Sequence, residues 1–356
     1  MVNQGFAFKS GNQLSARSRM IWRGLQLFFW LAGLAILFCL LFFPSTGILL
    51  FWNILIPIAP LLFVVAAGLW RNICPLATTN LLPRHLGLSK GKKLSQKEAG
   101  ILNLTAVIIF YLLVPLRHII FNRNGPATAG LIIFMALTGI CLGFFYEWKS
   151  VWCSGLCPVH PVEKLYGGNV LMPVPNAHCR ECKNCVIPCP DSTPNMHPNM
   201  IRKNNYHQLS GILITGGLPG FIWGWFHVPD QIRITASASI FQVYQMPFMG
   251  FVLTLLIYIC LIKILSPGRE DRLTGIFAAA GVSCYYWYRI PALFGFGNFS
   301  DDGLLLNLGN TIPAWTVFFI TIPATLFFIY WLVIRRKNNV SWVIRPDFAV
   351  YEKLIQ

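Results

Sequence analysis

The sequence predicts an all-α polytopic membrane protein with about eight transmembrane helices. Of its 356 residues, 55% are apolar and only 11% are charged, which lies far outside the balance of a soluble globular protein. The apolar residues form runs of about 20 or more, the length that a helix needs to cross a hydrocarbon core of about 30 Å. The formal net charge of +16 is spread between these runs and is not gathered on an aromatic-rich basic domain, so nucleic acid is not expected as a partner.

The eight predicted spans follow from these apolar runs. Prolines and glycines interrupt the fifth span, which makes it the weakest, and the second span carries two prolines. No cleavable secretory signal is expected, because residues 1–19 are polar and basic and the first apolar run is too long. The spans lie near residues 20–43, 46–70, 99–122, 127–148, 208–226, 239–265, 273–296 and 310–334.

The basic residues predict the orientation of these helices. The N-terminal segment, the loops 71–98, 149–207 and 266–272, and the C-terminal tail together hold 22 of the 28 Lys and Arg residues. The positive-inside rule therefore places both termini and both cysteine-bearing loops in the cytoplasm, with the chain in a bacterial-type inner membrane. That compartment is reducing, so disulfides are not expected among the eleven cysteines.

Four regions are predicted along the chain. The first four helices read as two hairpins, each of which runs into a Cys-Pro turn, at Cys74-Pro75 and at Cys157-Pro158. The matching position of these turns indicates an internal repeat. The regions are a four-helix membrane region (1–148), a cytoplasmic segment (149–207), a second four-helix membrane region (208–334) and a cytoplasmic tail (335–356).

The cytoplasmic segment carries the most specific motif. Cys179, Cys182, Cys185 and Cys189, followed by Pro190, spell CxxCxxCxxxCP. This spacing is typical of bacterial ferredoxins, whose thiolates hold 4Fe-4S clusters. A zinc site is the alternative, but zinc-binding cysteines usually come as two well-separated pairs. The sequence therefore predicts a small ferredoxin-like iron–sulfur segment on the cytoplasmic face.

A second, partial motif lies upstream, where Cys153, Cys157 and Pro158 spell CxxxCP. In two-cluster ferredoxins the fourth cysteine of each run binds the other cluster. Cys74 lies at the cytoplasmic end of the second span and is the obvious further ligand, although a buried apolar cysteine is the alternative. The pattern predicts cluster 1 at Cys157, Cys179, Cys182 and Cys185, and cluster 2 at Cys74, Cys153 and Cys189.

Cluster 2 lacks an identified fourth ligand. Trp70 occupies the place in the first hairpin that Cys153 holds in the second. His160, His178, Cys141 or a non-protein ligand could complete the set. The cysteines within predicted spans have no partners at ligand spacing and are expected to be packing residues; they are Cys39, Cys141, Cys260 and Cys284.

A second redox centre is conceivable at the outer ends of the helices. His118 and His227 are expected at similar depth on different helices, where two imidazoles could hold a b-type haem. The alternative is that both are interfacial anchors. The tryptophans and tyrosines nearby are explained by an aromatic belt, and a quinone pocket between helices is a further possibility.

The segments CSGLCP and CRECKNCVIPCP resemble the membrane-bound 4Fe-4S polyferredoxin family, which includes the NapH, NosR, NirI and CcoG proteins. The resemblance covers about residues 60–195, since the cluster chemistry lies there. It implies electron transfer at the cytoplasmic face, linked to quinol oxidation or to the support of a respiratory metalloenzyme. The chain departs from the pattern in its single complete ferredoxin run, in Trp70, in the four helices after residue 208 and in lacking a flavin-binding domain.

The leading hypothesis is an electron relay within an oxidoreductase complex, without catalytic residues of its own. It would take electrons from a ferredoxin, a flavodoxin or quinol and pass them to a respiratory enzyme. One alternative is an assembly factor that reduces a metal or thiol, and another is a structural subunit that binds zinc. The basic loop 71–98 is expected to contact anionic lipid, with docking of an acidic donor as the alternative. Transport is disfavoured, because ionisable residues are nearly absent from the spans.

Overall fold

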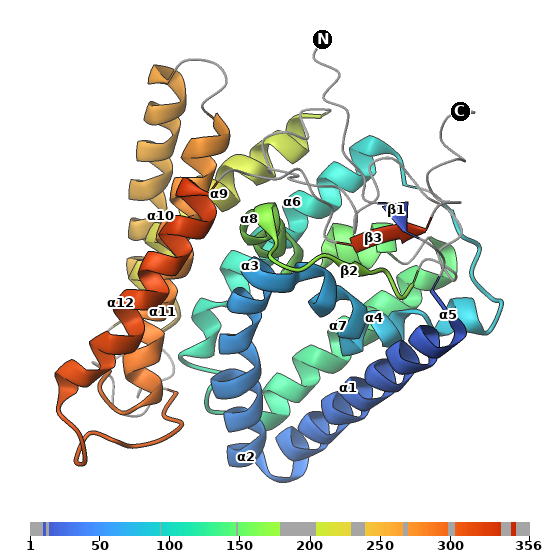
Figure 1. Ribbon diagram of the computed structural model, residues 1–356, viewed down its shortest axis with the longest axis horizontal. Coiled ribbons are helices and arrows are strands. Elements are labelled where there is room, and N and C mark those ends of the chain that lie inside the picture. Colours follow the sequence, from blue (N-terminus) through green and yellow to red (C-terminus); the bar gives the residue numbers. More distant parts are fainter. Residues whose placement is uncertain are drawn as a thin grey trace.

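Helices make up nearly all of the regular structure in the computed structural model (Figure 1), which describes residues 10–11, 14–92, 94–146, 149–178, 204–228, 239–265, 270–297, 303–335 and 343–346. Within these ranges, seven helical segments are long and apolar enough to cross a membrane. The expected all-α, multi-pass membrane protein is therefore confirmed. The seven segments are Ala16–Phe42, Pro44–Asn80, Gln96–Arg117, Gly125–Phe145, Asn205–Phe226, Ile240–Ile264 and Ala314–Ile334.

The first half of the chain forms two hairpins, and local caps define where helices begin. A capping box starts α6. The Glu98 backbone N–H donates to Ser95 Oγ, and the Ser95 backbone N–H donates to the Glu98 carboxylate. The elements are α1 (Ala16–Phe42), α2 (Pro44–Ile48), π-helical η1 (Leu49–Leu55), α3 (Ile56–Ile73), α4 (Pro75–Asn80), α5 (Leu82–His85), α6 (Gln96–Leu113), 3₁₀-helical η2 (Pro115–Arg117) and α7 (Gly125–Phe145).

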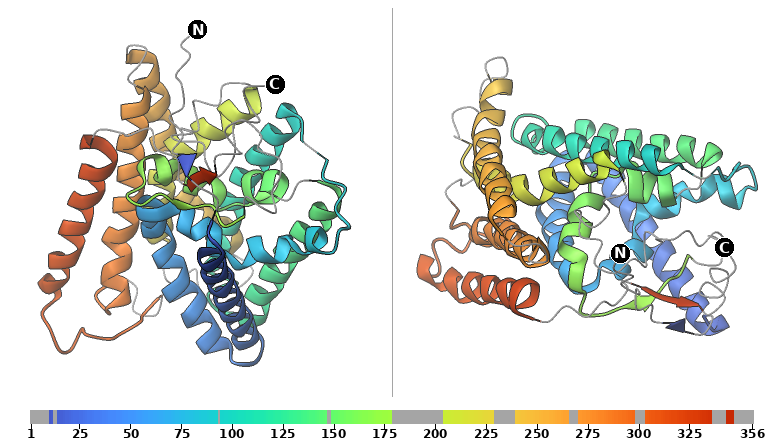
Figure 2. Two further views of the ribbon diagram at one scale, coloured as in Figure 1. Left: turned by 45° about the vertical axis from the view of Figure 1, so that its right-hand side comes forward. Right: turned by 90° about the horizontal axis from the view of Figure 1, so that it is seen from above.

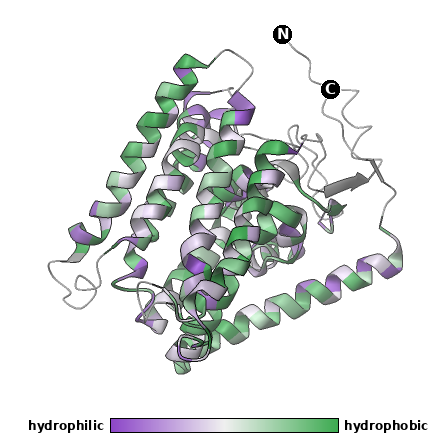
Figure 3. Ribbon diagram, turned by 60° about the vertical axis from the view of Figure 1, so that its left-hand side comes forward, coloured by the Kyte–Doolittle hydropathy of each residue, from purple (hydrophilic) through white to green (hydrophobic). Residues whose placement is uncertain are grey.

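The second half adds a short buried helix and a bundle of long ones. The elements are π-helical η3 (Lys149–Leu156), α8 (His160–Tyr166), η4 (Gly167–Asn169), α9 (Asn205–Phe226), α10 (Ser239–Ile264), α11 (Glu270–Leu293), η6 (Ala314–Val317), α12 (Phe318–Ile329) and η7 (Tyr330–Ile334). Figure 2 shows α10, α11 and α12 on one side of the molecule, with α9 between them and the helices of the first half of the chain. The long helices are largely hydrophobic along their length (Figure 3), as a lipid environment requires.

The central core joins the two halves of the chain. It contains Phe63 of α3, Val107 of α6, Tyr166 of α8, Leu218 of α9 and Val282 of α11. In an 18-residue apolar stretch of α9, 72% of the residues are buried, whereas in matching stretches of the other six spans only 11–28% are buried. The two predicted membrane regions therefore share one core, with α9 in its interior. A helix surrounded by protein can carry glycine and proline, because its neighbours replace the packing that lipid would otherwise supply.

The seventh predicted span, 273–296, corresponds to α11, which is long enough at 24 residues but is less apolar than the seven segments named above. Its sequence begins with Glu270, Asp271 and Arg272 and includes small and polar residues, most of which are buried against other helices. Gly275 of α11 contacts the backbone of Leu332 in η7. At its other end, Arg289 donates to the carbonyl of Trp52 at 2.9 Å. The helix thus runs the full length of the bundle beside α9 and α12.

The helix α3 is broken at Ala66, whose φ of −152° and ψ of 64° are not helical. The break frees the carbonyl of Val65, which accepts the backbone N–H groups of Leu171 at 2.8 Å and Met172 at 3.1 Å. Backbone groups without helical partners are costly in a membrane protein unless another segment satisfies them. Here the segment that follows α8 does so, and it is thereby held against α3.

A small parallel sheet, which the sequence patterns do not predict, lies at one end of the bundle (Figure 1). Its strands are β1 (Ser10–Gly11), β3 (Val343–Pro346) and β2 (Val174–Pro175), in that spatial order. Ser10 pairs with Arg345, and Val174 pairs with Val343. The sheet joins segments from near both ends of the chain to the segment that precedes Cys179. We call this end of the bundle, which also carries Cys74 and Cys157, the cysteine face.

Candidate metal centre

Cys74 lies at the junction between α3 and α4. Its extended conformation, with φ of −57° and ψ of 121°, ends α3, as the residue before a proline commonly does. Pro75 then begins α4, where its missing N–H is not needed. The Cys74 carbonyl accepts from the Thr78 N–H at 3.1 Å. The Cys-Pro sequence therefore produces a sharp corner, and the thiol lies at that corner.

The second Cys-Pro turn also leads into a short helix, but it follows a π-helical segment and not an α-helix. Cys153 lies within π-helical η3, and the Cys157 N–H closes the last wide turn on the Trp152 carbonyl at 2.9 Å. Pro158 follows, and α8 begins two residues later at His160. Short π-helical segments are rare and occur frequently at functional sites. Both predicted turns are thus present, and each leads into a short helix.

The three thiols of these turns lie close to one another. Cys74 and Cys153 pack against the same two residues of the first hairpin, Ala77 and Leu81. Burial, reinforced by the neighbouring thiols of Cys153 and Cys74, raises the pKa of Cys157 to about 12. Such thiols stay neutral at neutral pH unless a positively charged metal group replaces their protons. The gathering of sulfur donors, and not their raised pKa, is what suits this site to a soft metal or an iron–sulfur cluster.

A buried ion pair links the two Cys-Pro turns. Arg71 Nη1 lies 3.4 Å from Glu163 Oε2, and the two side chains are only 6% and 4% exposed. Arg71 Nη2 donates to the carbonyl of Cys153 and to the hydroxyl of Ser154, both at 3.1 Å. His160 Nδ1 lies 3.4 Å from Arg71 Nη1. Burial, together with the Arg71 charge, holds the pKa of His160 well below its usual range, so its imidazole is neutral.

The segment that leads to Cys179 is fixed to the end of α3. Asn72 Nδ2 donates to the Pro175 carbonyl at 2.8 Å, and Asn72 Oδ1 accepts from the Ala177 N–H at 3.2 Å. His178 is fully buried, with its Nε2 3.5 Å from Gln26 Nε2. His178 is the last described residue before the ferredoxin-type run, which begins in the sequence at Cys179.

The ferredoxin-type run itself lies outside the described residues. Cluster 1 beyond Cys157, and the contribution of Cys189 to cluster 2, therefore stay predictions. Among the residues that are described, no three His, Cys, Asp or Glu side chains are close enough to hold a single metal ion. A cubane is larger than one ion, so its thiolates stand further apart. Cys74 and Cys153, assigned to cluster 2, both pack against the small cluster of Ala77 and Leu81, and Cys157, assigned to cluster 1, is their neighbour.

The candidates for the fourth ligand of cluster 2 differ in placement. Cys141 is exposed on α7, as expected of a residue that faces lipid, and is the least suited. His160 and His178 are both buried on the cysteine face. The Nδ1 atom of His160 is already within 3.5 Å of Glu163. Trp70 packs edge-on against Phe63 at 5.3 Å and so acts as a core residue.

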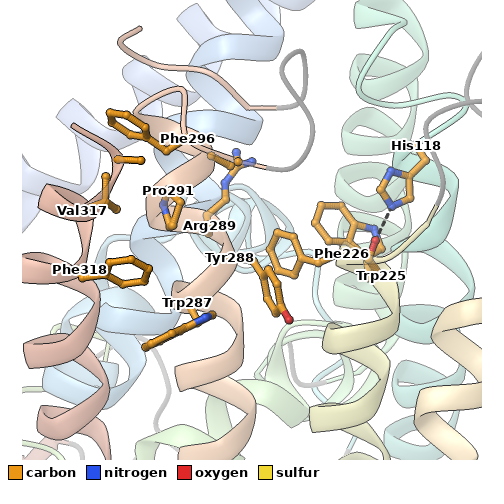
Figure 4. Close-up of a pocket in the computed structure, with 13 residues that line it drawn as sticks. His118, Trp225, Phe226, Trp287, Tyr288, Arg289, Pro291, Phe296, Val317 and Phe318 are labelled. Carbon is orange, nitrogen blue, oxygen red and sulfur yellow. Dashed lines mark hydrogen bonds between the residues drawn. The ribbon is translucent and has the colours of Figure 1, made fainter. Parts of the chain in front are cut away.

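At the opposite end of the bundle, an aromatic cavity of about 220 Å³ lies between α9, α11 and the start of α12 (Figure 4). His118 is buried at its edge, stacks on Trp225 and has its Nε2 3.0 Å from the Trp225 carbonyl. Its lining includes Trp225, Phe226, Trp287, Tyr288, Arg289 and Phe318.

The two histidines of the expected haem site do not face each other. His227 stacks on Trp223, and its Nδ1 lies 2.7 Å from the Trp223 carbonyl. Trp223 and Trp225 are two residues apart on α9, so they point to different sides of that helix. The cavity also suits a single-ring head group better than a macrocycle. The haem pair stays a prediction that this geometry does not favour.

Three residues of the site, Arg71, Asn72 and Glu163, are not marked by any motif in the sequence. Arg71 belongs by position to the basic loop 71–98, yet it is buried. One signal was present, because Glu163 is the single acidic residue in the sequence from 149 to 178. A lone acid so close to a cysteine motif would need a buried cation nearby.

The comparisons with known proteins leave the chain without an assigned family. No family model matches it, no curated protein matches it, and no solved structure matches it.

Proposed function

We propose that the protein is a membrane-integral iron–sulfur electron-transfer protein. The observation that carries the proposal is the gathering of Cys74, Cys153 and Cys157 from two separate hairpins, beside the segment that leads to Cys179. Neighbouring cysteines packed only for their volume would not require two Cys-Pro corners, a π-helical segment and a buried cation. Cluster 1 and cluster 2, as the sequence predicts them, are part of this proposal.

The chain's own residues would shape the environment of a bound cluster, which would accept and pass on single electrons. The buried turns keep water away from the thiols, and the corner at Pro75 sets the direction of Cys74. Hydrogen bonding, burial and nearby charge are the means by which a protein tunes the reduction potential of a cluster.

In the proposed topology the cysteine face lies in the cytoplasm. Because β1 and β3 belong to one sheet, residues near the two ends of the chain lie on the same side. An even number of crossings is therefore needed, and α11 supplies the eighth through its contacts with η7 at one end and Trp52 at the other. The positive-inside rule then assigns the cysteine face to the cytoplasm.

The proposed partners are a ferredoxin, a flavodoxin or quinol as the donor and a respiratory enzyme as the acceptor. The aromatic cavity between α9, α11 and α12 is where a quinone ring would bind, since its rim residues Trp287 and Phe318 are exposed at the helix surface. A role in the assembly of a metalloenzyme uses the same clusters, and transient rather than stoichiometric association with the partner would favour it.

Metal analysis after anaerobic purification tests the proposal. The protein should contain iron and acid-labile sulfide and give the electron paramagnetic resonance signal of a reduced 4Fe-4S cluster. Cys157→Ser should lower the iron content and change that signal, whereas Cys260→Ser, at an exposed position on α10, should leave both unchanged. Zinc without iron or sulfide would refute the proposal and favour the structural subunit.

A separate measurement tests the outer cavity. Organic extraction of the purified protein should release quinone, and Trp287→Ala should reduce the amount retained. A Soret band in the visible spectrum that His118→Ala abolishes would instead show a haem.

A further inference from the structure

The ion pair of Arg71 and Glu163 lies between the two cysteine-bearing turns. Arg71 is three residues before Cys74, and its guanidinium reaches across to the backbone of Cys153 and the hydroxyl of Ser154. Glu163 reaches it from α8, six residues after Cys157. A single buried contact therefore joins α3, η3 and α8, the three elements that position the cysteines of the first and second hairpins.

We propose that Arg71 and Glu163 set the reduction potential of cluster 2, to which Cys74 and Cys153 are assigned, with Arg71 also holding the two Cys-Pro turns at a fixed separation. This inference rests on the proposed function. Both are positioning residues, since neither is expected to bind the cluster.

Packing alone does not account for the pair. Burying two charges costs several kcal/mol per ion in desolvation, and apolar residues of similar volume often replace such pairs with no loss of stability. The fold could therefore fill this space with leucine or methionine. A guanidinium with donors in a rigid fork does what apolar residues cannot, because it binds the Cys153 carbonyl and the Glu163 carboxylate at once.

The electrostatic effect follows from the sign of each charge. Reduction adds negative charge to a cluster, so a nearby positive charge stabilises the reduced form and raises the potential. A nearby carboxylate has the opposite effect. Both effects are strong in a buried site, where the effective dielectric constant is low. Removing Arg71 and removing Glu163 should therefore shift the potential in opposite directions.

Other titratable groups face this pair. The neutral His160 lies within 3.5 Å of both Arg71 Nη1 and Glu163 Oε2. Lys164 is buried on the same helix, and His207 of α9 also acts on His160. Because the Arg71 charge is one cause of the lowered pKa of His160, each titration is repeated at a second pH, and a potential shift that is equal at both pH values is assigned to the substituted residue.

The test is an anaerobic redox titration followed by electron paramagnetic resonance, with iron content measured on the same samples. Arg71→Gln should lower the midpoint potential and Glu163→Gln should raise it, each relative to the unsubstituted protein. Lys97→Gln is the matched control, because Lys97 is an exposed residue at the start of α6 and its substitution changes the net charge by the same amount as Arg71→Gln. It should leave the potential unchanged.

Arg71→Lys separates charge from geometry. Lysine keeps the positive charge but lacks the fork, so it should retain a potential near that of the unsubstituted protein while lowering iron content. If Arg71→Gln retains no iron, Arg71→Lys and Glu163→Gln carry the comparison. A Glu163→Gln potential equal to or below the original would overturn the inference. Absence of iron from the unsubstituted protein would instead overturn the proposed function.

Discussion

Arg117 shows how a single cation can join three parts of this chain. Its guanidinium carbon lies 4.0 Å from the ring centroid of Trp52 and 5.0 Å from that of Trp225. Trp52 in turn donates to the Phe121 carbonyl at 3.1 Å. The first hairpin, the second hairpin and α9 therefore meet at one side chain near the end of the bundle opposite the cysteine face.

We expect Arg117→Ala to destabilise the protein by about 1–3 kcal/mol, because it removes a desolvated cation–π contact on two rings together with the packing of the arginine stem. Thermal unfolding in detergent would measure the loss. Arg123→Ala, at an exposed position six residues away, is the matched control and should change stability little. Equal effects of the two substitutions would contradict this account.

Some residues of the candidate site can be predicted from their spacing in the sequence, and others cannot. The cysteines could be found from the sequence, because ligand spacing and Cys-Pro pairs are local patterns. Arg71 could not, since the positive-inside rule treats every arginine near a span as a surface charge. Its burial depends on Glu163, which lies 92 positions further along the sequence. Only the folded chain brings the two together.

At the scale of elements, α9 and α10 bring their backbones close together at Gly220 and Gly250. A Cβ atom at Gly220 would collide with the carbonyl of Gly250, and a Cβ atom at Gly250 would collide with that of Gly220. Membrane helices gain van der Waals contact by such close approach, because lipid supplies no hydrophobic force between them. The glycines that weakened the fifth predicted span are what allow α9 to pack here.

Gly220→Ala should therefore force α9 and α10 apart and destabilise the protein by about 1–3 kcal/mol, the usual cost of overpacking. Gly130→Ala is the control, because a Cβ atom at Gly130 of α7 would meet nothing within 4 Å. That control should stabilise its helix slightly, by under about 1 kcal/mol. Chemical denaturation in mixed micelles would compare them, and a stabilised Gly220→Ala would refute the close contact.

Elements were predictable where their signal is local. Seven spans could be read from apolar runs, because lipid selects for apolar length directly. The span at α11 is harder to predict from the sequence. It carries polar residues such as Thr274 and Ser283, which are buried against other helices. Neither β2 nor the break at Ala66 could be predicted, because a two-residue strand exists only when its partner is in place.

At the scale of the whole molecule, we predict that α11 crosses the membrane and that both described ends of the chain lie on one side of it. If α11 crosses the membrane, a cysteine introduced near residue 268 and one near residue 306 should be labelled from opposite sides by a membrane-impermeant maleimide. Labels attached before residue 10 and after residue 346 should both be reached from the side that carries residue 268, because β1 and β3 lie in one sheet. Labelling of 268 and 306 from the same side would show that α11 does not cross.

The sheet makes a second prediction at this scale. A chain that stops at residue 342 lacks β3 and with it the partner of β2. Amide hydrogen exchange should then rise in residues 174–178, while exchange in α9–α12 stays unchanged. A chain that stops at residue 346 keeps β3 and is the control. Unchanged exchange in the shorter chain would mean that Asn72 and the buried His178 hold this segment without the sheet.

The position of β3 also bears on how the protein is made. The ribosome completes residues 343–346 only after all the long helices have been synthesised, yet these residues pair with the strand that leads into the ferredoxin-type run. The cysteines of the two Cys-Pro turns are translated early, whereas β3, the partner of β2, is translated late. The segment that leads to Cys179 therefore lacks its strand partner while the membrane helices are being synthesised, and it gains that partner only when β3 pairs with β2.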